Sequence, residues 1–174
     1  MRTIKIKYTF RKYKDLVFNQ ALYSTGSRDD ASDITQEVFI KYWDYMYNIK
    51  TGSVKSWLLK VTRNCCIDRS RKKKEQYFSE LESGDAVNYS VEIPAGEDSD
   101  PERNFSNAEV RQSIIRAIVS LPDNIKDIMI LRYIQDEPYD FISETLDVPV
   151  NTVKVYLHRG RKLLAEKLRK TMEE

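Results

Sequence analysis

The sequence predicts an all-α protein of two small helical domains joined by a flexible acidic linker, the C-terminal domain carrying a helix-turn-helix. Apolar residues recur mostly every three or four positions, which is the period of a helix buried on one side. Only 5 Gly and 5 Pro occur among the 174 residues, which favours helices with short connections. An acidic stretch without sustained periodicity separates two regions that have this pattern.

Charge is distributed unevenly along the chain, although the net charge is only +2. Residues 1–75 contain 17 basic and 8 acidic residues, residues 76–110 contain 1 and 9, and residues 111–174 contain 11 and 10. An acidic segment with two glycines, a proline and no periodicity is typical of a linker. We therefore expect domains at 1–75 and 101–174, with an acidic linker at 76–100.

Three helices are expected in the first domain. The first covers Phe10 to Thr25, and the preceding TIKIKY is interpreted as a frayed basic lead-in because no strand is available to pair with it. The second runs from Ser27 to about Tyr47 and opens on a capping pattern of Ser27 and Asp30. The third begins at Ser53 and runs to about Lys74.

The second domain opens at Asp100-Pro101-Glu102, which supplies a cap, a proline in the first helical position and an early acid. The last two helices are joined by DVPV, the short turn expected of a helix-turn-helix. The expected helices are Pro101 to Ser120, Pro122 to Gln135, Pro138 to Leu146, and Val150 to about Lys170.

The last expected helix has an apolar face and a basic face. Between Asn151 and Lys170 there are seven Lys or Arg residues against one acid, Glu166, which is enough charge to neutralise several phosphates. This pattern indicates a DNA-reading face, and a solvated basic helix is the alternative. The inward residues are Val153, Leu157, Gly160 and Leu164, and the outward residues are Asn151, Lys154, Val155, His158, Arg161 and Lys162.

A second basic cluster, RNCCIDRSRKKK, spans Arg63 to Lys74 with six basic residues and one acid. A basic helix near aromatic residues suits single-stranded DNA, whose backbone needs cations and whose bases need stacking surfaces. A charge run that simply faces solvent is the alternative. The anchoring residues are Trp57, Leu58, Val61 and Cys65, and the projecting residues are Lys60, Asn64, Ile67 and Arg71.

The motifs of common enzyme classes are missing from the sequence. It has no P-loop, dinucleotide glycine fingerprint or zinc spacing, and its one histidine, His158, has no evident catalytic partner. The adjacent Cys65 and Cys66 suit neither an ordinary disulfide nor a zinc site, so we interpret them as reduced thiols, Cys65 pointing inward. We expect no enzymatic activity, cofactor, metal or small-molecule substrate. Without a secretory signal or a long apolar run, a cytoplasmic location is expected.

The segment DITQEVFIKYWDY, from Asp33 to Tyr45, predicts a helix with two separate faces. One is apolar and suits a core. The other is a polar, acidic stripe with an isoleucine in its middle. The apolar face contains Ile34, Val38, Phe39, Tyr42 and Trp43, and the stripe contains Asp33, Gln36, Glu37, Ile40 and Asp44.

Three segments together resemble the extracytoplasmic-function (ECF) group of bacterial sigma factors: SRDDASDITQEVFIKYW, WLLKVTRNCCIDRSR, and LPDNIKDIMILRYIQDEPYDFISETLDVPVNTVKVYLHRGRKLL. The helix-turn-helix alone also resembles that of LuxR-type regulators. The resemblance implies an alternative sigma factor that binds core RNA polymerase, directs it to specific promoters and assists promoter melting. It also implies that the stripe docks on the β′ clamp helices, that the β flap is contacted, and that an anti-sigma factor is a partner.

The same resemblance implies roles for the DNA-facing residues. Asn64 corresponds to the position that helps hold a flipped base of the −10 element, and the loop Asn48 to Ser53 forms much of the base pocket. In the second domain, His158 and Val155 depart from common members, and Asp147 stands where a glycine is frequent. The residues implied for −10 phosphates are Lys60, Arg63, Arg69 and Arg71; those implied for the −35 element are Asn151, Thr152, Lys154, Val155, His158, Arg159, Arg161 and Lys162.

Two other classes of protein would share these features. A transcription regulator with two DNA sites would bind DNA tightly by itself and dimerise, whereas the resemblance implies no obligate homo-oligomer. An RNA-binding or sequestering adaptor would bind RNA and support no promoter-dependent transcription. Transcription by core polymerase from discrete promoters distinguishes a sigma factor from both.

Overall fold

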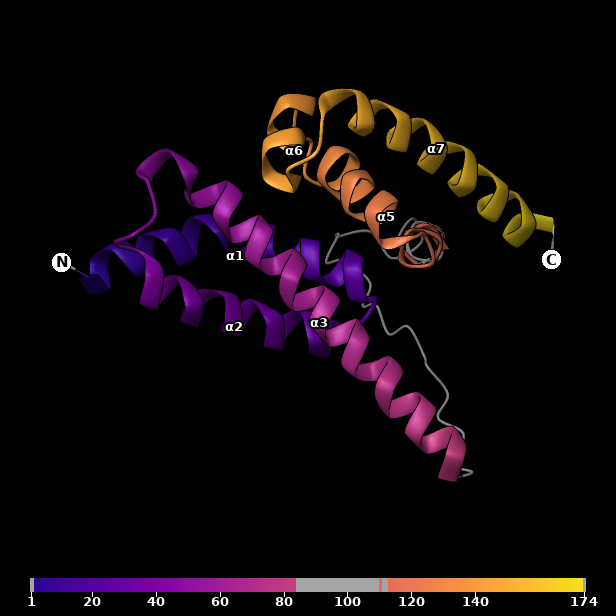
Figure 1. Cartoon of the computed structure of the whole chain (residues 1–174), viewed down its shortest axis with the longest axis horizontal. Coiled ribbons are helices and arrows are strands. Elements are labelled where there is room, and N and C mark those ends of the chain that lie inside the picture. The colour runs from indigo at the N-terminus through magenta and orange to yellow at the C-terminus, as the bar shows by residue number, and fades with distance from the viewer. Residues whose placement is uncertain (1, 84–109, 111–112, 174) are drawn as a thin grey trace, which may run out of the picture. The chain divides into compact units, whose positions relative to one another are not determined.

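The computed structural model describes residues 2–83, 110 and 113–173, and every regular element among them is helical (Figure 1). The chain divides into two compact units, Met1–Val91 (unit 1) and Glu92–Glu174 (unit 2). This confirms the predicted fold class of two small helical domains. None of the helices in the described part is long and apolar enough to cross a membrane.

Unit 1 is a three-helix arrangement of α1 (Arg2–Thr25), α2 (Arg28–Tyr45) and α3 (Val54–Ser83), with a 3-10 turn, η1 (Thr51–Ser53), before α3. Figure 1 shows α1 and α2 side by side and antiparallel, and α3 packs against both. Each helix contributes apolar side chains to one core, and full burial of each such side chain contributes about 1.5–3 kcal/mol. The core includes Val17, Ala21, Leu22, Ile34, Val38, Tyr42 and Leu58.

Helix α1 begins earlier than the sequence predicts. The segment expected to be a frayed lead-in to Phe10 is helical from Arg2. Ile6 packs against the core of unit 1, and the Thr9 hydroxyl lies 3.1 Å from the Tyr42 hydroxyl in a buried hydrogen bond. These contacts with α2 stabilise a helix that the local alternation of apolar and polar residues did not indicate.

The turn between α1 and α2 follows the predicted capping pattern. Gly26 has a φ of 68°, the left-handed conformation that commonly ends a helix, and its N–H donates to the Leu22 carbonyl at 2.8 Å. The Ser27 hydroxyl then accepts a hydrogen bond from the Asp30 N–H at 3.2 Å, which caps α2.

Helix α3 extends past Lys74, where the sequence predicted its end, and reaches Ser83. The intervening segment EQYFSELES contains neither glycine nor proline, so nothing in it stops a helix. Figure 1 shows these last turns of α3 projecting beyond the ends of α1 and α2. The rest of the predicted linker, from residue 84 onward, lies outside the described residues.

Unit 2 contains a helix at residues 113–119, then α5 (Asp123–Met129), α6 (Tyr139–Leu146) and α7 (Val150–Glu173). The expected helix start at Pro101 lies outside the described residues. The helix expected from Pro122 to Gln135 is α5 followed by a π-helical turn, η2 (Ile130–Ile134), closed by the Gln135 N–H donating to the Ile130 carbonyl at 3.1 Å.

The π turn begins within a run of residues that are all buried in unit 2. Seven consecutive residues, Ile125 to Leu131, are buried, whereas a regular helix with one core-facing side places neighbouring residues on different sides. The wider turn changes the direction in which the following side chains point. The period of the sequence alone did not indicate this.

Two backbone features bring α7 onto the rest of unit 2. Asp147 ends α6 with a φ of 56°, a left-handed conformation that glycine adopts more easily than other residues. The Ser143 hydroxyl donates a hydrogen bond to the Val148 carbonyl at 2.6 Å. At Gly160, α7 approaches α5 so closely that a Cβ would lie 2.6 Å from the Met129 sulfur. The prediction that Gly160 points inward is confirmed.

Candidate functional site

The two predicted faces of α2 are present in the structure. Ile34, Val38 and Tyr42 are fully buried in the core of unit 1. The opposite side is exposed, and Ile40 in its middle has 64% of its surface open to solvent. We call this exposed side the α2 stripe, and its residues are Asp33, Gln36, Glu37, Ile40 and Asp44.

A small electrostatic cluster borders the α2 stripe. The Lys41 ammonium lies 2.8 Å from a Glu37 carboxylate oxygen and 3.4 Å from the Cys65 sulfur. The hydrogen bond between Lys41 and Glu37 raises the pKa of Lys41 and lowers the pKa of Glu37. Burial raises the pKa of the Cys65 thiol. At neutral pH, Glu37 and Lys41 are therefore charged and Cys65 is a neutral thiol. Both cysteines are free and Cys65 is buried, as predicted; Cys66 is buried as well, which the sequence did not indicate.

The structure also identifies a residue that the sequence marked only as part of a cap. Asp30, in the first turn of α2, is buried and accepts hydrogen bonds from Lys73 and, at 3.3 Å, from Arg69 of α3. Arg69 also lies 3.5 Å from a carboxylate oxygen of Asp33 in the α2 stripe. The capping pattern placed Asp30 at the start of a helix, but no sequence signal identified cations some forty positions later as its partners.

The predicted −10 residues do not all share one face of α3. Lys60, Asn64 and Arg71 are exposed and follow one another at spacings of four and seven, which places them along one side of the helix. Arg63 is half-buried. Arg69 turns toward α2 and its carboxylates.

Arg71 remains accessible despite two neighbours of opposite charge. Its guanidinium lies 3.4 Å from Asp68 and 3.9 Å from Glu75 on the same helix, and all three side chains are mostly exposed. Such pairs are screened by water and contribute about 0–1 kcal/mol, so a phosphate can readily replace the carboxylates.

The end of α2 and the segment that follows it carry exposed aromatic residues to which the sequence analysis assigned no role. Tyr45 and Tyr47 are exposed, the Tyr45 ring lies 6.4 Å from the Trp57 ring, and Gly52 has open space around it. The Lys5 ammonium of α1 lies 5.8 Å from the centre of the Tyr47 ring. Basic and aromatic groups therefore lie together beside the predicted base pocket.

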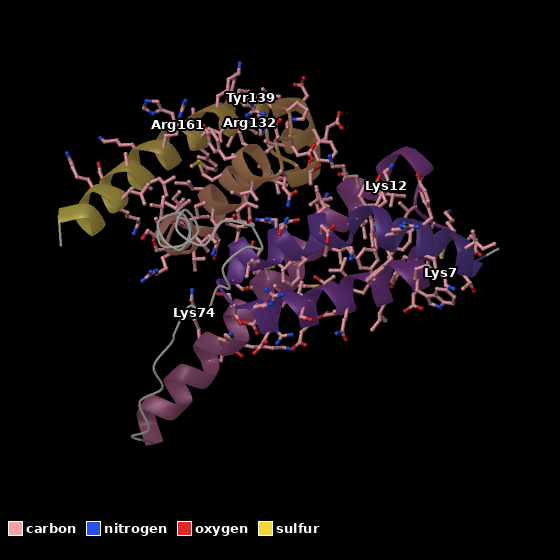
Figure 2. All side chains as sticks on the ribbon, turned by 180° about the vertical axis from the view of Figure 1, so that it is seen from behind. Lys7, Lys12, Lys74, Arg132, Tyr139 and Arg161 are labelled. Atoms are coloured by element: carbon pink, nitrogen blue, oxygen red, sulfur yellow. The ribbon has the colours of Figure 1, made fainter. Side chains whose placement is uncertain are left out.

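In unit 2, the predicted outward residues of α7 are exposed. Arg161 is one of them (Figure 2). Val153 and Leu157 on the opposite side are buried against the rest of the unit. Thr152 is half-buried, and it lies along the edge of the exposed face together with Arg159, seven residues later. The exposed residues are Asn151, Lys154, Val155, His158, Arg159, Arg161 and Lys162.

Unit 2 also contains a set of contacts around Arg132 that the sequence did not predict. The Arg132 guanidinium lies 5.6 Å from the centre of the Tyr139 ring and donates to the Asp136 carboxylate and the Glu137 carbonyl, both at 3.1 Å (Figure 2). These contacts join the π turn to the start of α6, so Arg132 helps to fix the position of the helix-turn-helix.

Two family models match this chain. The family described as "Sigma-70 region 2" matches residues 9–76, and "Sigma-70, region 4" matches residues 111–164. Together the two matches cover most of the chain and correspond to the two structural units.

Several known proteins are similar to this chain. The ECF RNA polymerase sigma factor SigW of Bacillus subtilis is 32% identical over 162 residues, which are 90% of this chain and 85% of SigW. The ECF RNA polymerase sigma factor SigE of Mycolicibacterium smegmatis is 32% identical over 165 residues, which are 94% of this chain and 62% of SigE.

Two solved structures have a similar fold. The sigma factor RpoE in complex with the anti-sigma factor NepR from Bartonella quintana matches with a TM-score of 0.74 at 19% identity, over 95% of this chain and 97% of RpoE. CnrH in complex with the cytosolic domain of CnrY matches with a TM-score of 0.65 at 15% identity, over 95% of this chain and 88% of CnrH. With both sigma regions matched in order and a relative that aligns along most of its length, this chain belongs to the ECF group of RNA polymerase sigma factors, which act in transcription initiation.

Proposed function

We propose that this protein binds core RNA polymerase, directs it to a specific set of promoters and assists the opening of promoter DNA. The observation that supports this most strongly is the α2 stripe. It presents Ile40, 64% exposed, among acidic and polar side chains on a helix whose other side is fully buried. An exposed apolar residue with a polar rim is typical of a protein-binding surface.

The α2 stripe docks on the clamp helices of the polymerase β′ subunit. Ile40 supplies the centre that loses its water on binding, and the carboxylates around it attract a basic partner surface. Glu37 is held in its charged form by Lys41, so the stripe keeps this negative charge at neutral pH. Unit 2 contacts the β flap of the same enzyme.

Unit 1 recognises the −10 element through α3 and the loop before it. Extruding a base from the duplex costs a few kcal/mol, which pocket contacts and a positive surface must offset. Asn64 and the loop 48–53 form the base pocket. Lys60, Arg63 and Arg71 hold phosphates, and Arg69 would have to leave Asp30 and Asp33 to do the same.

Unit 2 reads the −35 element with α7 in the major groove. Lys154, Val155, His158 and Arg159 contact base edges and phosphates, and the basic pair Arg161 and Lys162 contacts the backbone, as do Asn151 and Thr152 at the start of the helix. Support for this comes from the exposed, basic side of α7 and from the short turn that positions it.

The protein works in the cytoplasm without a cofactor or obligate homo-oligomerisation, and an anti-sigma factor regulates it. The sigma factor RpoE, which shares its fold, is solved in complex with the anti-sigma factor NepR. A partner of this kind would block activity by covering the α2 stripe. We further propose that residues 1–75 and 101–174 act as separate binding domains, joined by the acidic residues 76–100.

Reconstitution with core RNA polymerase tests the proposed function. We expect transcripts that start at discrete promoters only when core polymerase and this protein are both present. Tight, specific promoter binding by the protein alone, as a dimer and without transcripts, would instead identify an independent transcription regulator. Affinity for RNA without promoter-dependent transcription would identify an adaptor.

A paired substitution tests the docking surface. Glu37→Gln with Ile40→Ser should weaken association with core polymerase, measured in the absence of DNA, and leave the helical circular dichroism unchanged. The matched control is Asp15→Asn with Ile4→Ser, which makes the same chemical changes at exposed positions of α1. If the Glu37 and Ile40 pair leaves association intact, or weakens it no more than the control pair does, the α2 stripe is not the docking surface.

The base pocket is tested by Asn64→Ala. We expect this variant to bind core polymerase normally and to open promoter DNA poorly, as followed by permanganate reactivity of unpaired thymines. Equal losses of polymerase binding and of promoter opening would count against a role in capturing a base.

A further inference from the structure

The N-terminal half of α1 presents a basic and aromatic surface that the roles above do not use. Between Arg2 and Lys14 the sequence contains six basic residues and no acidic residue. Tyr8 has 65% of its surface exposed, and Lys7 and Lys12 are also exposed (Figure 2). The helical form of this segment fixes these side chains in space, which a frayed lead-in would not do.

The exposed groups form an ordered array. Lys5, Tyr8 and Lys12 are spaced by three and four residues and therefore lie along one side of α1. The Lys12 ammonium lies 5.8 Å from the centre of the Tyr8 ring. At the other end, the Lys5 ammonium lies 5.8 Å from the centre of the Tyr47 ring, which is 65% exposed. Two tyrosine rings thus alternate with two ammonium groups across α1 and the segment after α2.

This array continues directly into the proposed base pocket. Tyr47 immediately precedes the loop 48–53, and its contact with Lys5 joins that loop to α1. A strand whose base is held at the loop would therefore meet Tyr47 first and the side of α1 next. The continuity favours nucleic acid over an acidic protein segment, because exposed rings in register with cations match the alternation of bases and phosphates.

We propose that Lys5, Tyr8, Lys12 and Tyr47 form a binding site for single-stranded DNA, which extends the path of the melted promoter strand beyond the loop 48–53. This inference rests on the proposed function of unit 1. The two ammonium groups neutralise phosphates, and the two phenol rings stack on bases. Stacking on a ring does not depend on which base is present, so the site adds affinity for the open strand without adding sequence preference.

Fluorescence anisotropy of the full-length protein with a short labelled oligothymidine tests the site. Tyr8→Ala and Tyr47→Ala should each weaken binding at least about fivefold, the loss expected for one stacked base. Lys5→Gln with Lys12→Gln should weaken binding and also reduce the slope of log affinity against log salt by about 1.4, or about 0.7 per lost contact.

Two control variants distinguish a specific DNA site from nonspecific attraction between the basic surface and the oligothymidine. Tyr133→Ala removes an exposed tyrosine from unit 2 and should leave the affinity unchanged. Lys7→Gln with Lys14→Gln removes the same charge from another side of α1 and should have a smaller effect than the Lys5 and Lys12 pair. Circular dichroism establishes that each variant is folded.

The site is overturned if Tyr8→Ala and Tyr47→Ala bind oligothymidine as the unchanged protein does. It is also overturned if polyglutamate displaces the oligothymidine as well as unlabelled oligothymidine does, because the surface would then fit an acidic protein. Discrete transcripts in the reconstituted system together with unchanged binding by these variants would reject only this site. Tyrosine-dependent binding without such transcripts would reject only the proposed function.

Discussion

Replacing the buried Asp30 by asparagine should destabilise unit 1. The side chain of Asp30 is only 9% exposed and accepts hydrogen bonds from Lys73 and Arg69 of α3, so it ties the start of α2 to the basic segment of α3. Asparagine has nearly the same shape but no charge. The variant therefore removes the electrostatic part of the contact and leaves the packing in place.

The structure bounds the size of this effect. A hydrogen bond to a charged group contributes about 1.5–3 kcal/mol when it is well shielded, and exposed ion pairs contribute about 0–1 kcal/mol. Lys73 and Arg69 are 33% and 30% exposed, so the pairs with Asp30 fall between these limits. We expect Asp30→Asn to lower the free energy of unfolding by about 1–2 kcal/mol, since asparagine can still accept one hydrogen bond.

Urea unfolding followed by tryptophan fluorescence measures this loss in the correct part of the molecule. The protein has two tryptophans, Trp43 and Trp57, and both lie in unit 1, so the signal does not report the unfolding of unit 2. Asp29→Asn is the matched control, because Asp29 is an exposed neighbour in the same first turn of α2. It shares the interaction with the helix dipole, about 0.3–1 kcal/mol, but not the contacts with α3.

Equal unfolding midpoints for the two variants would refute the reasoning, because the loss at Asp30 would then be no more than the shared dipole term. A double-mutant cycle of Asp30→Asn with Lys73→Met gives a second test. A coupling energy near zero would mean that the pair contributes nothing to stability, whatever its geometry.

Three further predictions concern packing, backbone conformation and thiol chemistry. Gly160→Ala should destabilise unit 2 by about 1–2 kcal/mol in thermal unfolding, because the alanine Cβ would lie 2.6 Å from the Met129 sulfur. Alanine favours helices, so a higher unfolding temperature would mean that helix propensity outweighs the close contact. Asp147→Gly should raise the free energy of unfolding of unit 2 slightly, by up to about 1 kcal/mol, because glycine adopts a φ of 56° without strain. A clear loss of stability would show that the aspartate side chain matters more than its backbone conformation. Cys65 and Cys66 are both buried, so they should react with a thiol reagent much more slowly in the folded protein than in urea, and rapid labelling of the folded protein would contradict this. Burial raises the pKa of Cys65 above the ordinary thiol pKa of 9.0, so the unfolded thiol ionises first and the free energy of unfolding should fall as the pH rises above 9.0.

The sequence predicts best those helices that have one buried side and one exposed side. The buried and exposed sides of α2 and α7 follow directly from apolar spacing, so the α2 stripe and the basic face of α7 could be identified residue by residue. The cap at Ser27 and the left-handed residue Asp147 were also predictable, because each depends on its immediate neighbours.

The features that sequence reasoning missed depend on contacts between distant segments. The start of α1 is stabilised by Thr9 against Tyr42, and Asp30 finds its partners on a helix that lies far along the chain. The π turn begins within a run of seven residues, Ile125 to Leu131, that are all buried against the rest of unit 2. None of these contacts leaves a periodic signal in the segment that it stabilises.

The contact between Arg69 and α2 changes how substitutions in the basic segment of α3 must be interpreted. Arg69 and Arg71 are two residues apart, but Arg69 pairs with Asp30 and Asp33 whereas Arg71 pairs only weakly with exposed neighbours. Arg69→Ala would therefore weaken the fold of unit 1 and any phosphate contact together, and a loss of DNA binding in that variant could arise from either. Arg71→Ala removes the same charge at little cost in stability, so a loss of DNA binding there reports the phosphate contact itself. Comparing the DNA affinities of the two variants at equal folded fraction separates the structural contribution of this basic segment from its contribution to binding.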